Sequence, residues 1–165
     1  MDVRPPGSGH VLEPLTVHTA AEVLAWVSSR RDAVQFAGPD VAWPLTPELL
    51  VAGTSGHVPH ALRDVDGRLV ATGSLRRTGE RVGRIGRVLV DPAARGRGWG
   101  RRMMLALLDR ARDLPGIDVV ELGVYTFNTA AVALYTDLGF RPTGAERSTV
   151  VAGEVWISLE LRRPL

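Results

Sequence analysis

The hydrophobic positions along this chain follow two periods, one helical and one extended. Apolar residues recur at three- and four-residue spacing in four segments, and this period predicts helices. These segments are Ala20–Ser29, Pro47–Ala52, Gly98–Leu114 and Asn128–Leu138. Runs of β-compatible residues bounded by turn residues predict strands. The predicted strands are Leu15–Thr19, His60–Val65, Arg68–Leu75, Arg81–Val90, Asp118–Tyr125, Thr143–Val151 and Glu154–Leu161.

Turn signals between these segments set the order of the elements. Asp66-Gly67 is a two-residue hairpin signal, and the prolines and glycines of residues 36–47 predict a loop. The resulting order is β-α-α-β-β-β-α-β-α-β-β. It predicts an α/β domain with a mixed, mostly antiparallel sheet flanked by helices. One central βαβ crossover leads from Arg81–Val90 to Asp118–Tyr125.

Length and composition bound the class of protein. With 165 residues, 45% hydrophobic and 23% charged, the chain matches one soluble globular domain. We expect residues 1–10 to be a flexible tail without the order of a signal peptide, and residues 11–165 to form the domain. No apolar run approaches the roughly 18 residues of a membrane span. Without cysteine there is no disulfide or thiolate, so we expect a cytoplasmic protein, and four scattered histidines predict no metal site.

Positive charge is concentrated in the middle of the chain. All 20 basic residues are arginines, and nine of them lie between Arg76 and Arg102 against only Glu80 and Asp91. Such a block suits a polyanionic ligand, and a solvated Arg-rich hairpin explains it equally well. A nucleic-acid-binding module is the weaker interpretation, because the block lacks interleaved aromatic residues and a helix-turn-helix pattern.

A glycine-rich loop between a strand and a helix carries the strongest chemical signal. Residues 88–101 read Val-Leu-Val-Asp-Pro-Ala-Ala-Arg-Gly-Arg-Gly-Trp-Gly-Arg. Glycine lets the backbone approach a ligand, and the unsatisfied N–H groups of a first helical turn attract phosphate. The chain has no lysine for a P-loop, and Arg101 stands where a dinucleotide fingerprint starting at Gly96 needs its third glycine. Both of those phosphate loops are therefore excluded.

The remaining pattern, Arg-x-x-Gly-x-Gly over Arg95–Gly100, resembles the hallmark of the GNAT acetyltransferases. A second motif, Asn-x-x-Ala-x-x-x-Tyr-x-x-x-Gly-Phe over Asn128–Phe140, is similar to the family's second signature and lies at the family's spacing. The order of elements matches over about residues 60–161, whereas the first 55 or so match weakly. The resemblance implies the GNAT fold and acetyl-CoA-dependent transfer of an acetyl group to a primary amine of a small molecule or peptide.

By this resemblance, acetyl-CoA is the co-substrate and no metal is needed. The strand before the loop would bind the pantetheine arm through its main chain, and the loop amides would hold the pyrophosphate. A main-chain amide near Leu89 or Val90 would polarise the thioester carbonyl. The implied cofactor-binding residues are Val88, Leu89, Val90, Arg95, Gly96, Arg97, Gly98, Trp99, Gly100, Arg101 and Asn128.

Asn128 and Tyr135 lie two helical turns apart, so their side chains share one face of the helix. Asn128 is expected to cap that helix under any interpretation. A tyrosine on an apolar stripe is, in general, more often a core residue than a catalytic one. The resemblance instead implies that the Tyr135 hydroxyl lies near the sulfur of CoA and protonates the departing thiolate.

The general base is the least determined part of the site. Related enzymes that act on protein N-termini often carry a glutamate on the strand before the asparagine motif, and Gly123 stands at that position here. Glu121, on the same strand face, is the base that we predict, with a surface-facing or ion-paired Glu121 as the alternative. His57 and His60 titrate in a useful range and are further candidates.

The acceptor amine is not defined by the sequence. Aromatic residues that could line its pocket, or fill the core, are Trp26, Phe36 and Trp43. Acidic residues that would suit a cationic acceptor, or a solvated face, are Asp32, Asp40 and Glu48. A non-catalytic acyl-CoA-binding domain is the main rival function, and the presence of both Tyr135 and Asn128 argues against it. A homodimer is compatible with the sequence, and no nucleic-acid or membrane partner is expected.

Overall fold

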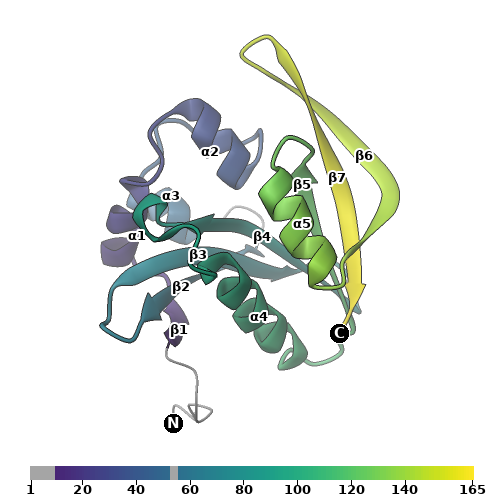
Figure 1. The fold of residues 1–165 in the computed structure, drawn as a ribbon, viewed down its shortest axis with the longest axis horizontal. Helices are drawn as coiled ribbons and strands as arrows, with labels where there is room; N and C mark the ends of the chain where they lie inside the picture. Colours follow the sequence, from purple (N-terminus) through teal and green to yellow (C-terminus); the bar gives the residue numbers. More distant parts are fainter. Residues whose placement is uncertain (1–9, 53–55) are drawn as a thin grey trace.

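The computed structural model describes residues 10–52 and 56–165 (Figure 1). In this part of the chain, seven strands form one sheet in the order β1-β2-β3-β4-β5-β7-β6. The strands are β1 (His10–Pro14), β2 (Val58–Asp64), β3 (Leu69–Arg77), β4 (Val82–Val90), β5 (Val119–Tyr125), β6 (Arg141–Val151) and β7 (Glu154–Pro164). The helices are α1 (Val17–Leu24), α2 (Arg30–Ala37), α3 (Pro47–Ala52), α4 (Trp99–Arg112) and α5 (Thr129–Asp137), with a 3₁₀ turn, η2 (Pro92–Ala94).

The predicted fold class is confirmed. Neighbouring strands pair antiparallel except β4 and β5, which pair parallel and are joined through α4. This pair is the central βαβ crossover expected from the sequence. All the predicted elements after residue 46 occur, with bounds shifted by a few residues. The β6–β7 hairpin forms the far edge of the sheet and extends beyond the helices (Figure 1).

Helices cover both faces of the sheet because side chains alternate along each strand. Leu62 of β2 and Val70 of β3 belong to the core cluster beneath α4 and α5. Their neighbours Ala61 and Leu69 belong to a second cluster with α1 and α3. α4 and α5 lie on the near face of the sheet in Figure 1. The main core therefore lies between these two helices and the central strands.

The two central strands separate along their length. β4 and β5 pair only through Val82–Arg84 and Val119–Glu121, although β4 continues to Val90 and β5 to Tyr125. Beyond this paired segment, β4 remains bonded to β3 and β5 to β7. The edges of β4 and β5 that face each other are left without a ladder partner in the described residues. Ligand main-chain groups can bind to such edges.

β4 also contains a bulge at Arg87. Two residues of β4, Arg87 and Val88, stand opposite the single residue Gly73 of β3. Arg87 has a φ of 53°, in the left-handed region that costs a residue with a side chain about 1–2 kcal/mol. A bulge bends a strand and redirects a side chain. Here it lies in the part of β4 that has separated from β5.

The N-terminal predictions were partly wrong. Leu15–Thr19 is not a strand: the first strand is β1, and the Thr16 hydroxyl caps α1 by accepting a hydrogen bond from the Thr19 amide. Leu15–Thr19 has β-compatible residues, but the cap outweighs this weak preference. Of the predicted tail, residues 1–9 lie outside the described residues, and His10 begins β1.

The first predicted helix also has different bounds. It begins at Val17 and ends at Leu24. The sequence assigned no element to residues 30–35, where most of α2 lies, and the last two residues of α2, Phe36 and Ala37, fall in the predicted loop. Ser29, taken from the sequence as the end of the first helix, is the N-cap of α2. Its hydroxyl accepts a hydrogen bond from the amide of Asp32 at 3.1 Å. The Ser-x-x-Asp spacing is a helix-start signal that could have separated the two helices.

Candidate active site

The glycine loop leads into α4 without a side-chain cap. The N-cap residues of α1, α2 and α5 each accept a hydrogen bond from a first-turn amide through their side chains; they are Thr16, Ser29 and Asn128. The N-cap of α4 is Gly98, with a φ of 81°, and no described side chain caps this helix. A Cβ at Gly96 or Gly98 would meet nothing within 4 Å. The free N–H groups and the positive end of the helix dipole therefore face open space, as an anion site requires.

A cavity of about 750 Å³, here called the loop cavity, lies at this helix end. The end of β4, the glycine loop, the first turn of α4 and part of α5 line it. It brings together the predicted residues Val88, Leu89, Val90, Arg95, Gly96, Gly98, Trp99, Gly100, Arg101 and Asn128. Arg97 is exposed in the loop and is not part of the lining. Arg101 also pairs with Asp137 of α5, which ties the helix start to its neighbour.

A second cavity, of about 330 Å³, lies between the separated parts of β4 and β5. We call it the arginine cavity because four arginines line it, namely Arg76, Arg84, Arg87 and Arg147. Both cavities are lined by Gln35, Phe36, Val88, Asn128 and Tyr135. The two cavities therefore meet at the gap in the sheet, and their volumes fall in the range of small-molecule sites.

Tyr135 lies where the cavities meet. It is 8% exposed, and its ring packs edge-to-face on Phe140 with the ring centroids 6.1 Å apart. Burial raises the pKa of the Tyr135 hydroxyl to about 12. Asn128 begins the same helix, and its side-chain oxygen accepts from the Ala131 amide at 3.4 Å. The predicted cap is confirmed, and the pair lies on one face of α5 as the spacing indicated.

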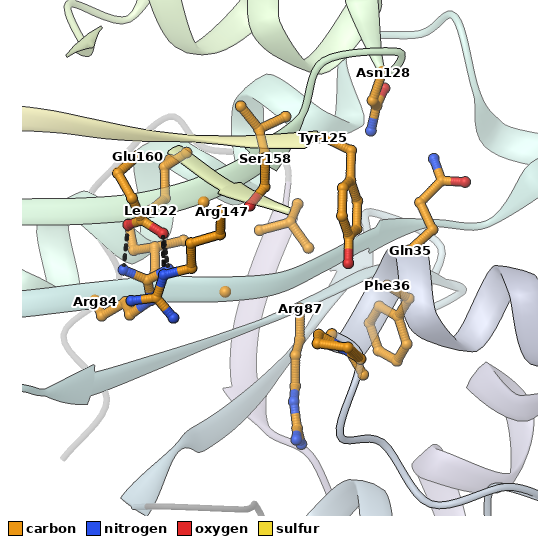
Figure 2. A pocket seen from close by; sticks show the side chains of 18 of the residues that line it. Gln35, Phe36, Arg84, Arg87, Leu122, Tyr125, Asn128, Arg147, Ser158 and Glu160 are labelled. Atoms are coloured by element: carbon orange, nitrogen blue, oxygen red, sulfur yellow. Dashed lines mark hydrogen bonds and ion pairs between the residues drawn. The ribbon is translucent and has the colours of Figure 1, made fainter. Parts of the chain in front are cut away.

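An ion pair lies beside Gly123, the position at which the family resemblance led us to look for a glutamate. Glu160 of β7 stands opposite Gly123, and its two carboxylate oxygens accept from Arg84 at 2.8 and 3.1 Å. Arg147 lies 3.5 Å from the same carboxylate (Figure 2). A Cβ at Gly123 would come within 3.0 Å of Arg84 and 3.3 Å of Glu160. Glycine at this position therefore makes room for the ion pair.

Sequence reasoning missed this ion pair. Arg84 and Glu160 are 76 residues apart, and only the register of three strands brings them together. The available signal was a charged residue at an inward position of each strand. Such residues are rarely buried unless they are paired. The signal indicates that a partner exists, but it does not say which residue that partner is.

His57 lines the arginine cavity as well. Its Nδ1 nitrogen lies 2.8 Å from the hydroxyl oxygen of Ser74. Burial, followed by the charges of Arg76, Arg87 and Arg84, lowers the pKa of the His57 imidazole to about 4. The imidazole is therefore neutral at physiological pH and can accept a hydrogen bond or a proton.

Two other base candidates lie outside both linings. Glu121 is on β5, and its carboxylate accepts from the Arg162 guanidinium at 2.9 Å. This is the ion-paired arrangement considered as its alternative, and its role as the base stays a prediction. His60 is 7% exposed within β2, where Nδ1 lies 3.0 Å from the main-chain oxygen of Val58. Burial lowers the pKa of His60.

The N-terminal residues considered as acceptor ligands divide into two groups. Those that line a cavity are Trp26, Phe36, Asp32 and Asp40. Those that line neither are Trp43 and Glu48. Within residues 10–52 and 56–165, no three His, Asp or Glu side chains gather as they would around a metal ion. No helix in the same ranges has the length and hydrophobicity needed to span a membrane.

Comparison with known proteins identifies the family. The profile of the Acetyltransferase (GNAT) family matches residues 24–140. The chain is 36% identical over 141 residues to the N-alpha-acetyltransferase RimI of Mycobacterium tuberculosis, an alignment that covers 82% of this chain and 84% of that protein. It is 45% identical over 131 residues to a mycothiol acetyltransferase of Beutenbergia cavernae, covering 75% of this chain and 43% of that protein.

A solved structure shares the fold. The spermidine N-acetyltransferase from Vibrio cholerae, crystallised with CoA and spermine, matches with a TM-score of 0.79 at 16% identity and covers 96% of both chains. At this identity the likeness concerns the fold alone. The family profile covers most of the chain, and the mycobacterial relative aligns over most of both proteins. This protein therefore belongs to the acetyltransferase (GNAT) family and is an enzyme that transfers an acetyl group to an amine.

Proposed function

We propose that this enzyme uses acetyl-CoA to acetylate the primary amine of a small molecule or peptide, with both substrates bound at once. The observation that carries the proposal is the junction of the two cavities at Val88, Asn128 and Tyr135. A ligand in the loop cavity and a ligand in the arginine cavity would touch at this junction. Direct transfer needs this contact between the two reacting groups.

The loop cavity fits acetyl-CoA, which supplies the acetyl group as a thioester at the end of a long pantetheine arm. The uncapped N–H groups of Gly100 and Arg101, with Arg95 beside them, would hold the pyrophosphate. The unpaired edge of β4 over residues 88–90 would bind the amides of the arm as a neighbouring strand does. A main-chain N–H near Leu89 would donate to the thioester oxygen.

Tyr135 would act as the general acid. Because burial raises its pKa to about 12, the hydroxyl keeps its proton at working pH. An unperturbed thiol has a pKa of about 8.5, and burial raises the pKa of a thiol too. A thiolate leaving at the same buried junction is therefore a stronger base than in water. The Tyr135 hydroxyl would give its proton to the sulfur as the carbon–sulfur bond breaks.

The acceptor must be a neutral amine when it attacks. The arginines that help to lower the pKa of His57 would also lower the pKa of an ammonium group bound beside them. A larger fraction of the bound amine would then be nucleophilic. Glu121 is the predicted base and, because it lies outside the lining, would act through water. His57, a neutral imidazole in the lining, is the other candidate to take the proton.

The proposal is tested by measuring binding and turnover separately. Calorimetry with acetyl-CoA should give saturable binding, and release of the CoA thiol should require an added amine. Initial rates with both substrates varied should fit a ternary complex. Binding of acetyl-CoA without turnover of any amine would favour the non-catalytic acyl-CoA-binding alternative. A protein that binds no acyl-CoA would overturn the proposal.

A further inference from the structure

A buried hydroxyl on β3 connects His57 to the main chain of β4. Ser74 is 1% exposed and lies opposite Gly86 in the β3–β4 ladder. Its hydroxyl donates to the main-chain oxygen of Gly86 at 3.0 Å and lies 2.8 Å from Nδ1 of His57. A hydroxyl has one proton to donate, so the second bond is donated by Nδ1–H of the imidazole. Ser74 therefore holds the ring in one orientation and one tautomer.

Gly86 lets this ring lie close to β4. A Cβ at Gly86 would come within 3.3 Å of Cε1 of His57, so a larger residue would push the ring away from the strand. Gly86 and Val88 are two residues apart on β4, and their Cα atoms are at most about 7 Å from each other. Val88 belongs to the junction of the two cavities. The imidazole therefore lies beside the place where the two substrates would meet.

The second ring nitrogen, Nε2, is accessible. Within residues 10–52 and 56–165, the imidazole makes one hydrogen bond, to Ser74, and Nε2 is not enclosed by protein. With the hydrogen on Nδ1, Nε2 carries a lone pair that can accept a proton. His57 lines the arginine cavity, so a ligand in that cavity can reach this nitrogen.

The carboxylates near the cavity are less suited to accept a proton from the bound amine. Glu121 lies outside the lining and accepts from Arg162. Glu160 lines the cavity, but both of its oxygens accept from a guanidinium group. Asp40 also lines it and is exposed, so water competes for its oxygens. His57 combines partial burial in the lining with a free acceptor atom.

We propose that Ser74 is a positioning residue of the reaction, and that it holds His57 so that Nε2 takes the proton of the acceptor amine. The inference rests on the proposed acetyl transfer and assigns the proton which that transfer releases. As the nitrogen lone pair forms the new C–N bond, the nitrogen gains positive charge and its N–H becomes acidic. That proton passes to Nε2 and then to water. The C–S bond breaks, and the sulfur takes the proton of Tyr135, which water then replaces.

The environment of His57 keeps it ready for this step. Burial, followed by the charges of nearby arginines, lowers its pKa to about 4, so Nε2 is unprotonated at any working pH. A base of this strength cannot remove a proton from a free ammonium group efficiently. It can take one from the more acidic nitrogen that forms during attack, and the proton is then quickly lost to water.

Two substitutions on β3 test the role of Ser74. Ser74→Ala removes the hydroxyl that fixes the tautomer and should lower kcat by about five- to tenfold. Thr72→Val is the matched control. Thr72 is 2% exposed, lies on the same face of β3, and donates to the main-chain oxygen of His60 at 2.8 Å, outside the cavity. Each variant loses one buried hydroxyl, so both should lose similar stability, but only Ser74→Ala should lose kcat.

Variants of His57 separate proton transfer from packing. His57→Asn keeps an N–H near the position of Nδ1, which can still donate to Ser74, but has no acceptor at the position of Nε2. It should lower kcat by about a hundredfold. Acetyl-CoA affinity should be kept, because His57 does not line the loop cavity. In His57→Ala, added imidazole should restore part of kcat, whereas pyrazole, which has the same shape and is a much weaker base, should not.

The readout is the CoA thiol released at saturating acetyl-CoA, after subtraction of the rate without enzyme. The acceptor is whichever of spermidine, phenylethylamine, alaninamide and trialanine the wild type acetylates fastest. Circular dichroism and calorimetry with acetyl-CoA establish that each variant is folded. Should His57→Asn fail to fold, His57→Ala with the two added bases makes the same comparison.

The outcomes separate this inference from acetyl transfer itself. A near-normal kcat in His57→Asn would exclude His57 as the proton acceptor and leave the acetyltransferase function standing. Equal losses of kcat in Ser74→Ala and Thr72→Val would make the Ser74 contact structural, and rescue of His57→Ala by both added bases would do the same for His57. Either result overturns the inference. If none of the four amines releases CoA although acetyl-CoA binds, the proposed function fails and the inference fails with it.

Discussion

The Nδ1 nitrogen of His57 lies 2.8 Å from the hydroxyl oxygen of Ser74. That hydroxyl donates its only proton to the main-chain oxygen of Gly86, at 3.0 Å. Ser74 must therefore accept from His57, so the hydrogen of the neutral imidazole is on Nδ1. Nε2 is left with its lone pair. The contact fixes one tautomer of a side chain that lines the arginine cavity.

This environment predicts a pH-dependent stability that belongs to His57. Its pKa is about 4 in the folded protein and about 6.5 in an unfolded chain. Between these values the unfolded chain binds more protons, so the free energy of unfolding should fall as pH drops from about 6.5 to about 4. His57→Asn, which cannot gain a proton there, should lose less stability over this window. Urea unfolding at pH 7.5, 5.5 and 4.5 measures the difference between the two proteins, and parallel curves would show that His57 is not responsible.

Two glycines with the same backbone provide a matched test of cofactor binding. Gly98 and Gly67 have φ values of 81° and 80°, and a Cβ at either would meet nothing within 4 Å. Gly98→Val and Gly67→Val should therefore cost similar stability from left-handed strain, at least about 1–2 kcal/mol or several degrees of Tm. Only Gly98 faces the loop cavity.

Acetyl-CoA should therefore distinguish the two variants. At a hundredfold excess over Kd it should stabilise the wild type and Gly67→Val by about 2.7 kcal/mol. Acetyl-CoA should not raise the Tm of Gly98→Val, because the valine side chain fills the space for the pyrophosphate. Equal shifts in both variants, measured by thermal melts, would exclude the loop as the phosphate site.

Two variants distinguish a role of Glu121 as the base from its ion pair with Arg162. Glu121→Gln and Arg162→Gln both break the contact, and exposed pairs of this kind contribute about 0–1 kcal/mol. Only Glu121→Gln removes the carboxylate. If Glu121 deprotonates the acceptor, Glu121→Gln should reduce kcat most at low pH, whereas Arg162→Gln should not. Identical pH–rate profiles for the two variants and the wild type would leave His57 or water as the proton acceptor.

Periodicity and turn residues were sufficient for the second half of the fold. Strands such as β4 and helices such as α4 have uniform patterns and clear ends, so their predicted bounds differ from the structure by only one or two residues. The N-terminal part was harder because single polar residues determine its helix starts. Thr16 and Ser29 each cap a helix, and both lay inside segments assigned to another element.

The candidate site also has one part that the sequence predicts and one part that it does not. The loop and Asn128 were predictable because their roles depend on local backbone, and all but Arg97 of the predicted cofactor residues line the loop cavity. The arginine cavity was not predictable. It forms where β4 separates from β5 and brings in residues of β3 and β6 as well, so its composition depends on register rather than on any local motif.

The last prediction concerns Tyr135 as the general acid. Tyr135→Phe keeps the ring and its packing on Phe140 and deletes only the hydroxyl. General acid catalysis is typically worth 10²–10⁴-fold, so kcat should fall by about that factor while acetyl-CoA affinity is kept. Because the pKa is about 12, ionisation of Tyr135 should not lower the wild-type kcat between pH 8 and 10. A tyrosine with an ordinary pKa of about 10 would be half deprotonated at pH 10, so a kcat that depends on its proton would fall by about half there.

A purely structural tyrosine makes a different prediction. Removal of its hydroxyl would change stability by at most about 1 kcal/mol, the size of one hydrogen bond, and leave turnover within a few-fold of the wild type. Tyr125, the other tyrosine, is the matched control. It lines the arginine cavity but not the loop cavity, so Tyr125→Phe should act on the KM of the acceptor rather than on kcat. Measuring kcat, acetyl-CoA affinity and Tm on both variants separates the two roles. A small Tm loss with near-normal kcat in Tyr135→Phe would make Tyr135 a core residue, and the thiolate would then leave without this acid.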